Sequence, residues 1–340
     1  MNFTNFMNLK NLKKIFDSFN TLKVLIIGDL MVDVYYWGDV SRISPEAPVP
    51  IVAVSKKESR MGGAANVAIN IQAMGATPIL CGVIGADSNG EKLVRILKEK
   101  KLPTEGILLS EDRPTTTKTR IISSNHHIVR IDDETDEFIG EKLTKKLLEQ
   151  IEKFIKAGKA DVIIFEDYDK GVISPELIKK VTALAKKNKI PTVVDPKKRN
   201  FTDYNEVTLF KPNLKELREG LKVEVQAGDF KQVQAVTEQL RKSQKIANVL
   251  VTLSEHGVFI NSDKEKKLVP AHIRKISDVS GAGDTVVSIA ALCCALNLPP
   301  VEMAFLSNLA GGQVCEKTGV VPVDKKQLLE EAMQFMNGTK

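Results

Sequence analysis

The sequence predicts an α/β fold, a three-layer α/β/α sandwich with a central, mainly parallel sheet and a small β lid. Apolar runs of strand length alternate with stretches of helical spacing through most of the chain, which is the pattern of a parallel sheet covered by helices. Two further β-rich stretches have no helix to cover them, and these predict the lid. No Pro-, Gly- or Ser-rich linker divides the 340 residues, so we expect one domain over 1–340.

The first third of the chain alternates strands with helices. Leu22 to Ile27 is a continuous apolar run ending in Gly28-Asp29, as expected of a parallel strand buried on both faces. The elements predicted after it are half-exposed strands at 34–40 and 51–54, a helix at 63–74, a strand at 78–84, a helix at 90–100 and a short strand at 106–109.

The lid is predicted from segments 34–60 and 113–133. Residues 117–123 and 127–131 are rich in β-branched side chains and are joined by Ser124-Asn125-His126, which indicates a hairpin. Because uncovered sheet edges and faces invite pairing, we expect a homodimer in which the lids cover each other.

The alternation resumes after the lid and continues to the last helix. The predicted elements are helices at 140–156, 175–187, 213–221 and 230–242, strands at 161–165, 192–194, 208–210 and 247–252, an antiparallel pair at 257–260 and 267–270, and closing helices at 283–296, 300–316 and 325–335.

Composition and charge exclude several classes of function. The net charge of +6 is spread over 49 basic and 43 acidic residues along the whole chain, which does not suit a nucleic-acid-binding stripe. The polar N-terminus lacks the apolar core of a signal peptide, and no run of eighteen apolar residues occurs. We therefore expect a cytoplasmic protein without a membrane partner. The four cysteines have no metal-ligand spacing and are predicted to be small buried hydrophobes.

The strongest local signal is Ser280-Gly281-Ala282-Gly283-Asp284, a turn of small residues leading into an apolar helix. Unpaired backbone amides at a helix start can hold a phosphoryl group, and the glycines let it approach. Asp284 would then be a catalytic carboxylate. The alternative is that Asp284 only complements the helix dipole.

Two other polar turns also follow strands and should therefore lie at the same sheet edge, where ligands bind in open α/β sheets. One contains Ser254 and Gly257, and the other begins with Asn213. Asn213 and Glu216 are three residues apart and can both face Mg²⁺ or its water shell. The alternative is a capping box.

The early turns offer candidate ligands for sugar hydroxyls. Asp29 and Asp33 follow the first strand, and Gly62, Gly63 and Asn66 lie at the start of a helix. Ordinary turn chemistry is the alternative. The cluster Asp195-Pro196-Lys197-Lys198-Arg199 could meet a substrate phosphate or remain a solvated loop.

Gly62-Gly63-Ala64-Ala65-Asn66, Asn213-x-x-Glu216 and Gly281-Ala282-Gly283-Asp284 together resemble the ribokinase-like (PfkB) carbohydrate kinases over nearly the whole chain. Within that family, the run from Ser41 to Pro50 is similar to the D-glycero-β-D-manno-heptose 7-phosphate kinases of lipopolysaccharide-core precursor synthesis. Asp167-Tyr168-x-Lys170-Gly171 and Asp195-Pro196-Lys197 are similar to them too.

The resemblance implies transfer of the ATP γ-phosphoryl group to the C1 hydroxyl of the heptose phosphate. It implies that Asp284 is the base and that Gly281, Ala282 and Gly283 form the anion hole. It further implies a nucleotide and magnesium pair at Asn213 and Glu216, with Glu216 acting on the metal through water. The remaining assignments it implies are an adenosine site at Thr252, Ser254, Gly257 and Asn308, and a sugar clamp at Asp29, Asp33, Gly62, Gly63 and Asn66.

Five basic residues are candidates for the 7-phosphate by their charge and expected position: Arg42, Lys170, Lys197, Arg120 and Arg130. The expected cofactors are ATP and Mg²⁺, and a monovalent cation is a further candidate. Some close relatives append a nucleotidyltransferase domain, whereas this chain stops soon after its last predicted helix, so we expect the kinase step alone. The alternatives are another sugar or phosphosugar kinase of this family, and a non-catalytic sugar-binding protein on the same fold.

Overall fold

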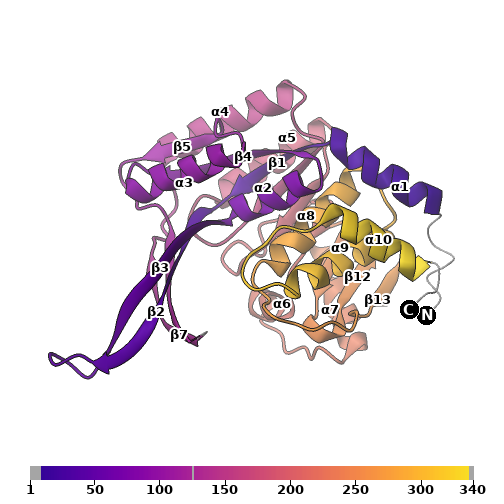
Figure 1. Cartoon of the computed structure of the whole chain (residues 1–340). Helices are drawn as coiled ribbons and strands as arrows, with labels where there is room; N and C mark the ends of the chain where they lie inside the picture. Colours follow the sequence, from indigo (N-terminus) through magenta and orange to yellow (C-terminus); the bar gives the residue numbers. More distant parts are fainter. Residues whose placement is uncertain (1–8, 125, 337–340) are drawn as a thin grey trace.

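The computed structural model describes residues 9–124 and 126–336, and its main body is built on a nine-stranded sheet among these residues (Figure 1). The strands lie in the order β13-β12-β11-β10-β9-β8-β1-β4-β5. All neighbours from β10–β11 to β4–β5 are parallel, and β12 and β13 add an antiparallel edge. The strands are β1 (Lys23–Gly28), β4 (Thr77–Gly85), β5 (Ile107–Ser110), β8 (Val162–Glu166), β9 (Thr192–Asp195), β10 (Leu209–Phe210), β11 (Asn248–Thr252), β12 (Val258–Ser262) and β13 (Lys266–Val269).

Helices cover both faces of this sheet, so the body has three layers. Alternate residues of β1 enter opposite cores: Val24 and Ile26 pack on one side, and Leu25 and Ile27 on the other, as the two-residue period of a strand requires. Helices on the first side are α1 (Leu9–Ser18), α2 (Ala64–Ala73), α3 (Ser88–Glu99), α8 (Ala282–Ala295), α9 (Pro300–Cys315) and α10 (Lys325–Met336). Those on the second are α4 (Glu141–Lys156), α5 (Pro175–Lys187), α6 (Leu214–Leu221) and α7 (Phe230–Ser243).

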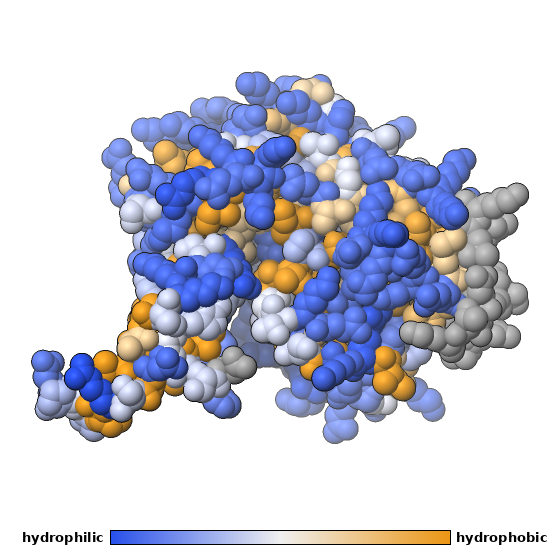
Figure 2. Space-filling view, viewed as in Figure 1, coloured by the Kyte–Doolittle hydropathy of each residue, from blue (hydrophilic) through white to orange (hydrophobic). Residues whose placement is uncertain are grey.

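A separate four-stranded sheet in the described residues forms the lid, in the order β3-β2-β6-β7. Its strands are β2 (Leu30–Ile43), β3 (Pro50–Gly63), β6 (Thr117–Ser123) and β7 (His126–Asp133). The β2–β3 hairpin continues beyond the last pair with β6, Gly38 with Ser123, and projects from the body (Figure 1). Figure 2 shows hydrophobic side chains on this projecting hairpin and a hollow between it and the body.

The structure confirms the predicted fold class and corrects several elements. We predicted nothing before residue 22, yet α1 forms there because Leu12 and Phe16, four residues apart, are both buried against the body. The strands β2 and β3 are much longer than predicted. The predicted hairpin turn includes residue 125, which lies outside the described residues. All four cysteines are free and buried, as predicted. No helix in the described parts of the chain is long and apolar enough to cross a membrane.

Candidate active site

The start of α8 places Asp284 at the centre of the candidate site. Gly281 adopts a left-handed conformation with φ +78°, which a glycine allows, and the helix begins at Ala282. Asp284 is 6% exposed. Its two carboxylate oxygens accept hydrogen bonds from different elements: Asn66 Nδ2 donates to Oδ2 at 2.5 Å, and the Tyr168 hydroxyl donates to Oδ1 at 2.8 Å. The carboxylate is therefore held in one orientation.

Three buried carboxylates meet at this point. Glu166 ends β8, Asp195 ends β9, and their oxygens and one of Asp284 lie within 4.8 Å of one another. Both oxygens of Glu166 and Oδ1 of Asp195 are buried without a hydrogen-bond partner in the described structure. Orphaned carboxylate oxygens of this kind fit Mg²⁺, which prefers oxygen ligands. The cluster is a candidate metal site, and it includes Asp284.

Burial governs the acid–base state of this cluster. It raises the pKa of Asp284 to about 6, where Asp195 adds to the rise and the hydrogen bonds from Asn66 and Tyr168 oppose it. Burial, and then the charges of Asp195 and Asp284, raise the pKa of Glu166 well above its ordinary range. With a pKa of about 6, Asp284 is mostly ionised at neutral pH, while Glu166 retains its proton more strongly.

Two lysines balance the negative charge. Lys211 is buried, and its Nζ lies 2.9 Å from Asp195 Oδ2. Lys197 Nζ lies 3.7 Å from Asp195 Oδ1 and also forms an ion pair with Glu216. Burial alone would lower the pKa of Lys197, but Asp195 and Glu216 outweigh it and raise this pKa. Both lysines therefore remain charged beside the carboxylates.

The predicted magnesium pair forms the capping box that was its alternative. Asn213 accepts a hydrogen bond from the Glu216 amide and Glu216 Oε2 accepts one from the Asn213 amide, each at 2.8 Å. Because Lys197 occupies Glu216 Oε1, both carboxylate oxygens are engaged in this structure. Asn213 nevertheless lies at the expected sheet edge, because it forms a parallel bridge with Thr252.

Of the residues predicted to surround adenosine, Thr252 lies beside Pro212, whereas Gly257 and Asn308 both contact Pro270. Thr252 donates its amide hydrogen to the carbonyl of Pro212 at 3.1 Å, and Ser254 follows directly in a 3₁₀ turn. Gly257, with φ +90°, packs so closely on the backbone of Pro270 that a Cβ would overlap it. Asn308 Nδ2 donates to the Pro270 carbonyl at 2.9 Å. The fold thus brings Gly257 and Asn308 together although they are far apart in sequence.

The predicted sugar clamp divides into two parts. Asp33 lies in the lid strand β2, where it pairs with Arg120 of β6, and a Cβ on Gly62 would overlap Asp33 Oδ2. Asp29 behaves differently from the prediction, because its carboxylate is 1% exposed and accepts the amides of Tyr168, Lys170 and Val172 at 2.8–3.1 Å. It holds a loop in place, with Oδ2 accepting the amides of Tyr168 and Lys170 and Oδ1 accepting that of Val172.

The lower part of the clamp lies at the start of α2. Gly63 has φ +57°, and the next amide, that of Ala64, donates to the Asp29 carbonyl at 3.0 Å. Asn66 lies one turn further on and its side chain binds Asp284 instead of being open to a ligand.

The structure accounts differently for the five basic residues predicted to bind a substrate phosphate. Four already have acidic partners: Lys170 pairs with Glu134, Arg130 with Asp132, Arg120 with Asp33, and Lys197 with Asp195 and Glu216. Arg42 lies near the end of the projecting hairpin, opposite Ile51, and the structure does not bring it to Asp284. Sequence shows the charge of such residues but not which carboxylate lies within reach.

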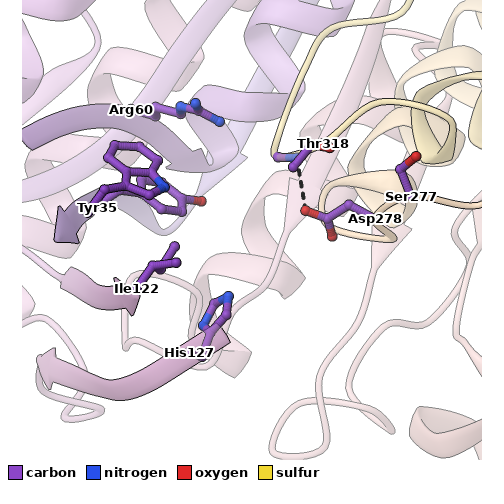
Figure 3. Close-up of a pocket in the computed structure, with 9 residues that line it drawn as sticks. Tyr35, Arg60, Ile122, His127, Ser277, Asp278 and Thr318 are labelled. Carbon is purple, nitrogen blue, oxygen red and sulfur yellow. Dashed lines mark hydrogen bonds between the residues drawn. The ribbon is translucent and has the colours of Figure 1, made fainter. Parts of the chain in front are cut away.

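A pocket of about 440 Å³ opens between the lid and the body. The rings of Tyr35 and Trp37 stack with centroids 5.4 Å apart, and the Arg60 guanidinium lies 5.0 Å from the Tyr35 ring centroid. Figure 3 shows Tyr35 and Arg60 facing Asp278 across this space. The lining residues are Tyr35, Trp37, Arg60, Ile122, His127, Ser277, Asp278, Thr318 and Gly319.

A parallel α/β sheet with a lid, and an ionised aspartate at an open helix start, are the features of a small-molecule kinase. The chain belongs to the pfkB family carbohydrate kinases, whose family model matches residues 21–326, and it is accordingly an ATP-dependent carbohydrate kinase. It is 39% identical over 313 residues to the bifunctional protein HldE of Sulfurimonas denitrificans and to that of Magnetococcus marinus. The matches cover 91% and 92% of this chain but 64% of each relative, so the chain spans less than two thirds of their length.

Solved structures with the same fold are more distant in sequence. Phosphofructokinase-2 from Escherichia coli, in its tetrameric inhibited form, matches with a TM-score of 0.75 and 19% identity over 92% of this chain and 99% of that one. Arabidopsis thaliana ribokinase complexed with ribose and ATP matches with a TM-score of 0.72 and 16% identity over 91% and 99%. At these identities the likeness establishes the fold.

Sequence reasoning missed several residues of the site. Glu166 ends β8, a buried strand beside β1. A search for polar residues at the ends of buried strands, which found Asp29, would therefore also have found Glu166. Lys211 directly precedes the turn at Asn213 and was passed over as part of it. Tyr168 belongs to the motif Asp167-Tyr168-x-Lys170-Gly171 but received no role of its own, and Arg60 gave no local signal. Only the packing of a loop on α8 and of the lid on the body places their side chains.

Proposed function

We propose that this kinase transfers the γ-phosphoryl group of ATP to the C1 hydroxyl of D-glycero-β-D-manno-heptose 7-phosphate, giving the 1,7-bisphosphate. The single observation that carries the kinase chemistry is the buried, oriented carboxylate of Asp284 at the start of α8. The choice of acceptor rests on the sequence resemblance from Ser41 to Pro50, and the similarity to HldE proteins supports it.

Asp284 would accept the proton of the acceptor hydroxyl as its oxygen attacks the γ-phosphorus. Phosphoryl transfer needs little covalent assistance, so positioning and charge neutralisation supply most of the rate. The helix start at Gly281 to Gly283 is suited to hold the transferred group, because its small residues let the group approach the Gly281 and Gly283 amides. The Ala282 amide donates to the Val279 carbonyl at 3.3 Å in this structure. The lid would exclude water, which competes with the sugar for ATP.

Glu166 and Asp195 are the side chains that would hold Mg²⁺, with Glu216 acting through water as the resemblance implies. When bound, the metal neutralises charge on the phosphates. In this structure the ammonium groups of Lys211 and Lys197 lie beside Asp195. Their positive charges would attract the phosphates of ATP to this cluster, because both lysines remain charged and lie at the carboxyl ends of the strands.

The pocket between lid and body is the position we assign to the phosphorylated end of the acceptor. Arg60 is 28% exposed and forms an ion pair with Glu58, which a second cation, Lys56, also binds at 3.0 Å. A substrate phosphate can replace Glu58 as the ion-pair partner of Arg60, because Glu58 remains paired with Lys56. The Asp278 carboxylate on the opposite wall accepts the amides of Ser280 and Gly319 at 2.9 Å, so those contacts partly compensate its charge.

The substrate assignment is tested with a panel of free and phosphorylated sugars and ATP, with the phosphorylated carbon identified by ³¹P NMR. We expect the heptose 7-phosphate to have the highest kcat/KM. Turnover of free ribose or fructose without turnover of the heptose phosphate would establish another sugar kinase of the family. Arg60→Ala should raise the KM for the phosphorylated acceptor at least tenfold and leave the KM for ATP unchanged. Lys57→Ala, an exposed residue of the same strand that lies over Tyr36 and does not line the pocket, is the control.

The lid also supports a homodimer, which we propose as the assembly. Apolar side chains are exposed on the lid sheet at Ile43, Val54 and Ile131 and in its β2–β3 turn at Val49, and a second lid could cover them. Val54→Lys should shift the mass measured by light scattering from dimer to monomer. A monomeric unsubstituted protein at micromolar concentration would refute this assembly.

A monovalent cation stays a prediction from the resemblance, and Escherichia coli phosphofructokinase-2 is known in complex with potassium. Turnover in potassium against tetramethylammonium buffers tests it for this chain. A cytoplasmic location is likewise a prediction.

A further inference from the structure

The loop after β8 connects the catalytic centre to the lid. Its backbone is fixed by Asp29, whose carboxylate accepts the amides of Tyr168, Lys170 and Val172. From this loop the Tyr168 hydroxyl reaches Asp284 Oδ1 at 2.8 Å, and Lys170 Nζ reaches Glu134 Oε1 at 2.7 Å. Glu134 in turn binds Lys118 of the lid strand β6 at 2.8 Å.

The hydrogen bond from Tyr168 complements the one from Asn66. Asn66 Nδ2 donates to Asp284 Oδ2, so the two donors approach the carboxylate from different elements and occupy one site on each oxygen. Each oxygen of a carboxylate has a second lone pair, which remains open to an acceptor hydroxyl. Fixing both oxygens therefore orients the base without blocking it.

Competing cations make this orientation necessary. Lys211 Nζ is 2.9 Å from Asp195 Oδ2, and it would lie 3.8 Å from a Cβ built on Gly283, next to Asp284 in the helix. Without a donor on Oδ1, the Asp284 carboxylate can turn toward this ammonium group and away from the acceptor. Lys197 is also near, with Nζ 5.2 Å from the Tyr168 ring centroid.

We propose that Tyr168 is a positioning residue that holds the Asp284 carboxylate in the orientation required to accept the proton of the sugar hydroxyl. The inference rests on the proposed role of Asp284 as base, and it is independent of which sugar is the acceptor. A misplacement of about 1 Å in a reacting group can cost about 100-fold in rate, so the loss of this donor should appear in kcat.

The chain supplies a matched control for the test. The Tyr204 hydroxyl donates to Asp167 Oδ2 at the same distance of 2.8 Å, and Tyr204 is fully buried. Asp167 also accepts hydrogen bonds from Asn200 Nδ2 and from the Asp169 amide, each at 2.9 Å, which hold it when the Tyr204 hydroxyl is removed, and it has no part in the proposed chemistry. Tyr168→Phe and Tyr204→Phe therefore each remove one hydroxyl from a tyrosine–aspartate pair, and the first keeps the ring beside Lys197.

Steady-state kinetics with ATP and the best acceptor from the panel, together with urea unfolding, distinguish the two roles. We expect Tyr168→Phe to lower kcat about 10- to 100-fold with the acceptor KM within about threefold. The fraction of ATP lost to hydrolysis should rise. Tyr204→Phe should keep kcat within about twofold even if its unfolding midpoint falls as much or more.

Several results would overturn the inference. Equal effects of the two substitutions on kcat would show that Tyr168 is only structural, and a loss confined to acceptor KM would make it a binding residue. Asp284→Ala is measured alongside to separate these failures from failure of the mechanism itself. If Asp284→Ala is inactive and Tyr168→Phe is fully active, the positioning role is wrong and the base is retained. If Asp284→Ala is active, the proposed base is wrong.

Discussion

Asp284→Asn should inactivate the enzyme and at the same time stabilise its fold at neutral pH. Burial raises the pKa of Asp284 to about 6 from an ordinary value of 3.8. Each tenfold change in a protonation equilibrium corresponds to about 1.4 kcal/mol, so keeping this side chain ionised at pH 7 costs the folded state about 3 kcal/mol. An amide has no such cost, although its NH₂ group must face one of the two donors now bound to the carboxylate.

The sign of the effect follows from proton linkage. The pKa is higher in the folded than in the unfolded state, so the folded state binds more protons between about pH 4 and pH 6. Stability from this group is therefore fully present below pH 4 and is lost as pH rises through 6. If poorer hydrogen bonding costs about 1 kcal/mol, the free energy of unfolding of Asp284→Asn should exceed that of the unsubstituted protein by about 2 kcal/mol at pH 7. That gain should shrink by about 2 kcal/mol at pH 4.5.

Urea unfolding at the two pH values measures this difference directly. Asp112→Asn is the control, because Asp112 is exposed and its substitution should change stability little at either pH. A stability difference for Asp284→Asn that is the same at pH 7 and pH 4.5 would refute the argument, since desolvation of a charge must vanish when the group is protonated. A loss of stability confined to pH 7 would refute it as well.

Other predictions follow from the same site. Because Asp284 must be ionised to act as the base, kcat/KM should fall about tenfold per pH unit below about pH 6, and an activity that is flat to pH 5 would contradict its pKa or its role. Lys211→Met leaves Asp195 without its closest cation and should destabilise the fold by about 3–5 kcal/mol in thermal or urea unfolding. Adding Asp195→Asn should recover more than half of that loss, whereas additive losses would show that the pair is not coupled. Gly62→Ala places a Cβ on Asp33 Oδ2 and should raise the acceptor KM at least tenfold with the ATP KM within twofold; unchanged acceptor binding would remove Asp33 from the clamp.

The sheet edge that holds the site could be predicted because it depends on strand order and direction alone. Parallel strands all end on one side, so the turns after 22–27, 208–210 and 247–252 had to meet there. The structure adds β8 and β9 to that edge, and with them Glu166 and Asp195. Asp284 was located by its glycine-rich helix start, which is a local signal that tertiary packing does not alter.

Which groups each charged side chain of the site contacts could not be predicted from the sequence. The spacing of Asn213 and Glu216 suits a magnesium pair and a capping box equally, and it gives no sign that Lys197 reaches the other oxygen of Glu216. Asp29 and Asp33 are both carboxylates after the first strand, yet Asp29 accepts three amides of a distant loop and Asp33 pairs with Arg120 of the lid. The partners lie 19 positions away in sequence for Glu216, 87 for Asp33 and 139 to 143 for Asp29.

The sequence by itself determined the α/β class, the edge of the sheet that carries the site and the identity of the candidate base, because hydrophobic period and glycine turns act over a few residues. Tertiary structure alone decided how that base is held. Asn66 from α2 and Tyr168 from the loop after β8 reach Asp284 only when three separate elements pack together. The pocket at Arg60 depends in the same way on the lid standing over the body, since its two walls come from opposite ends of the chain.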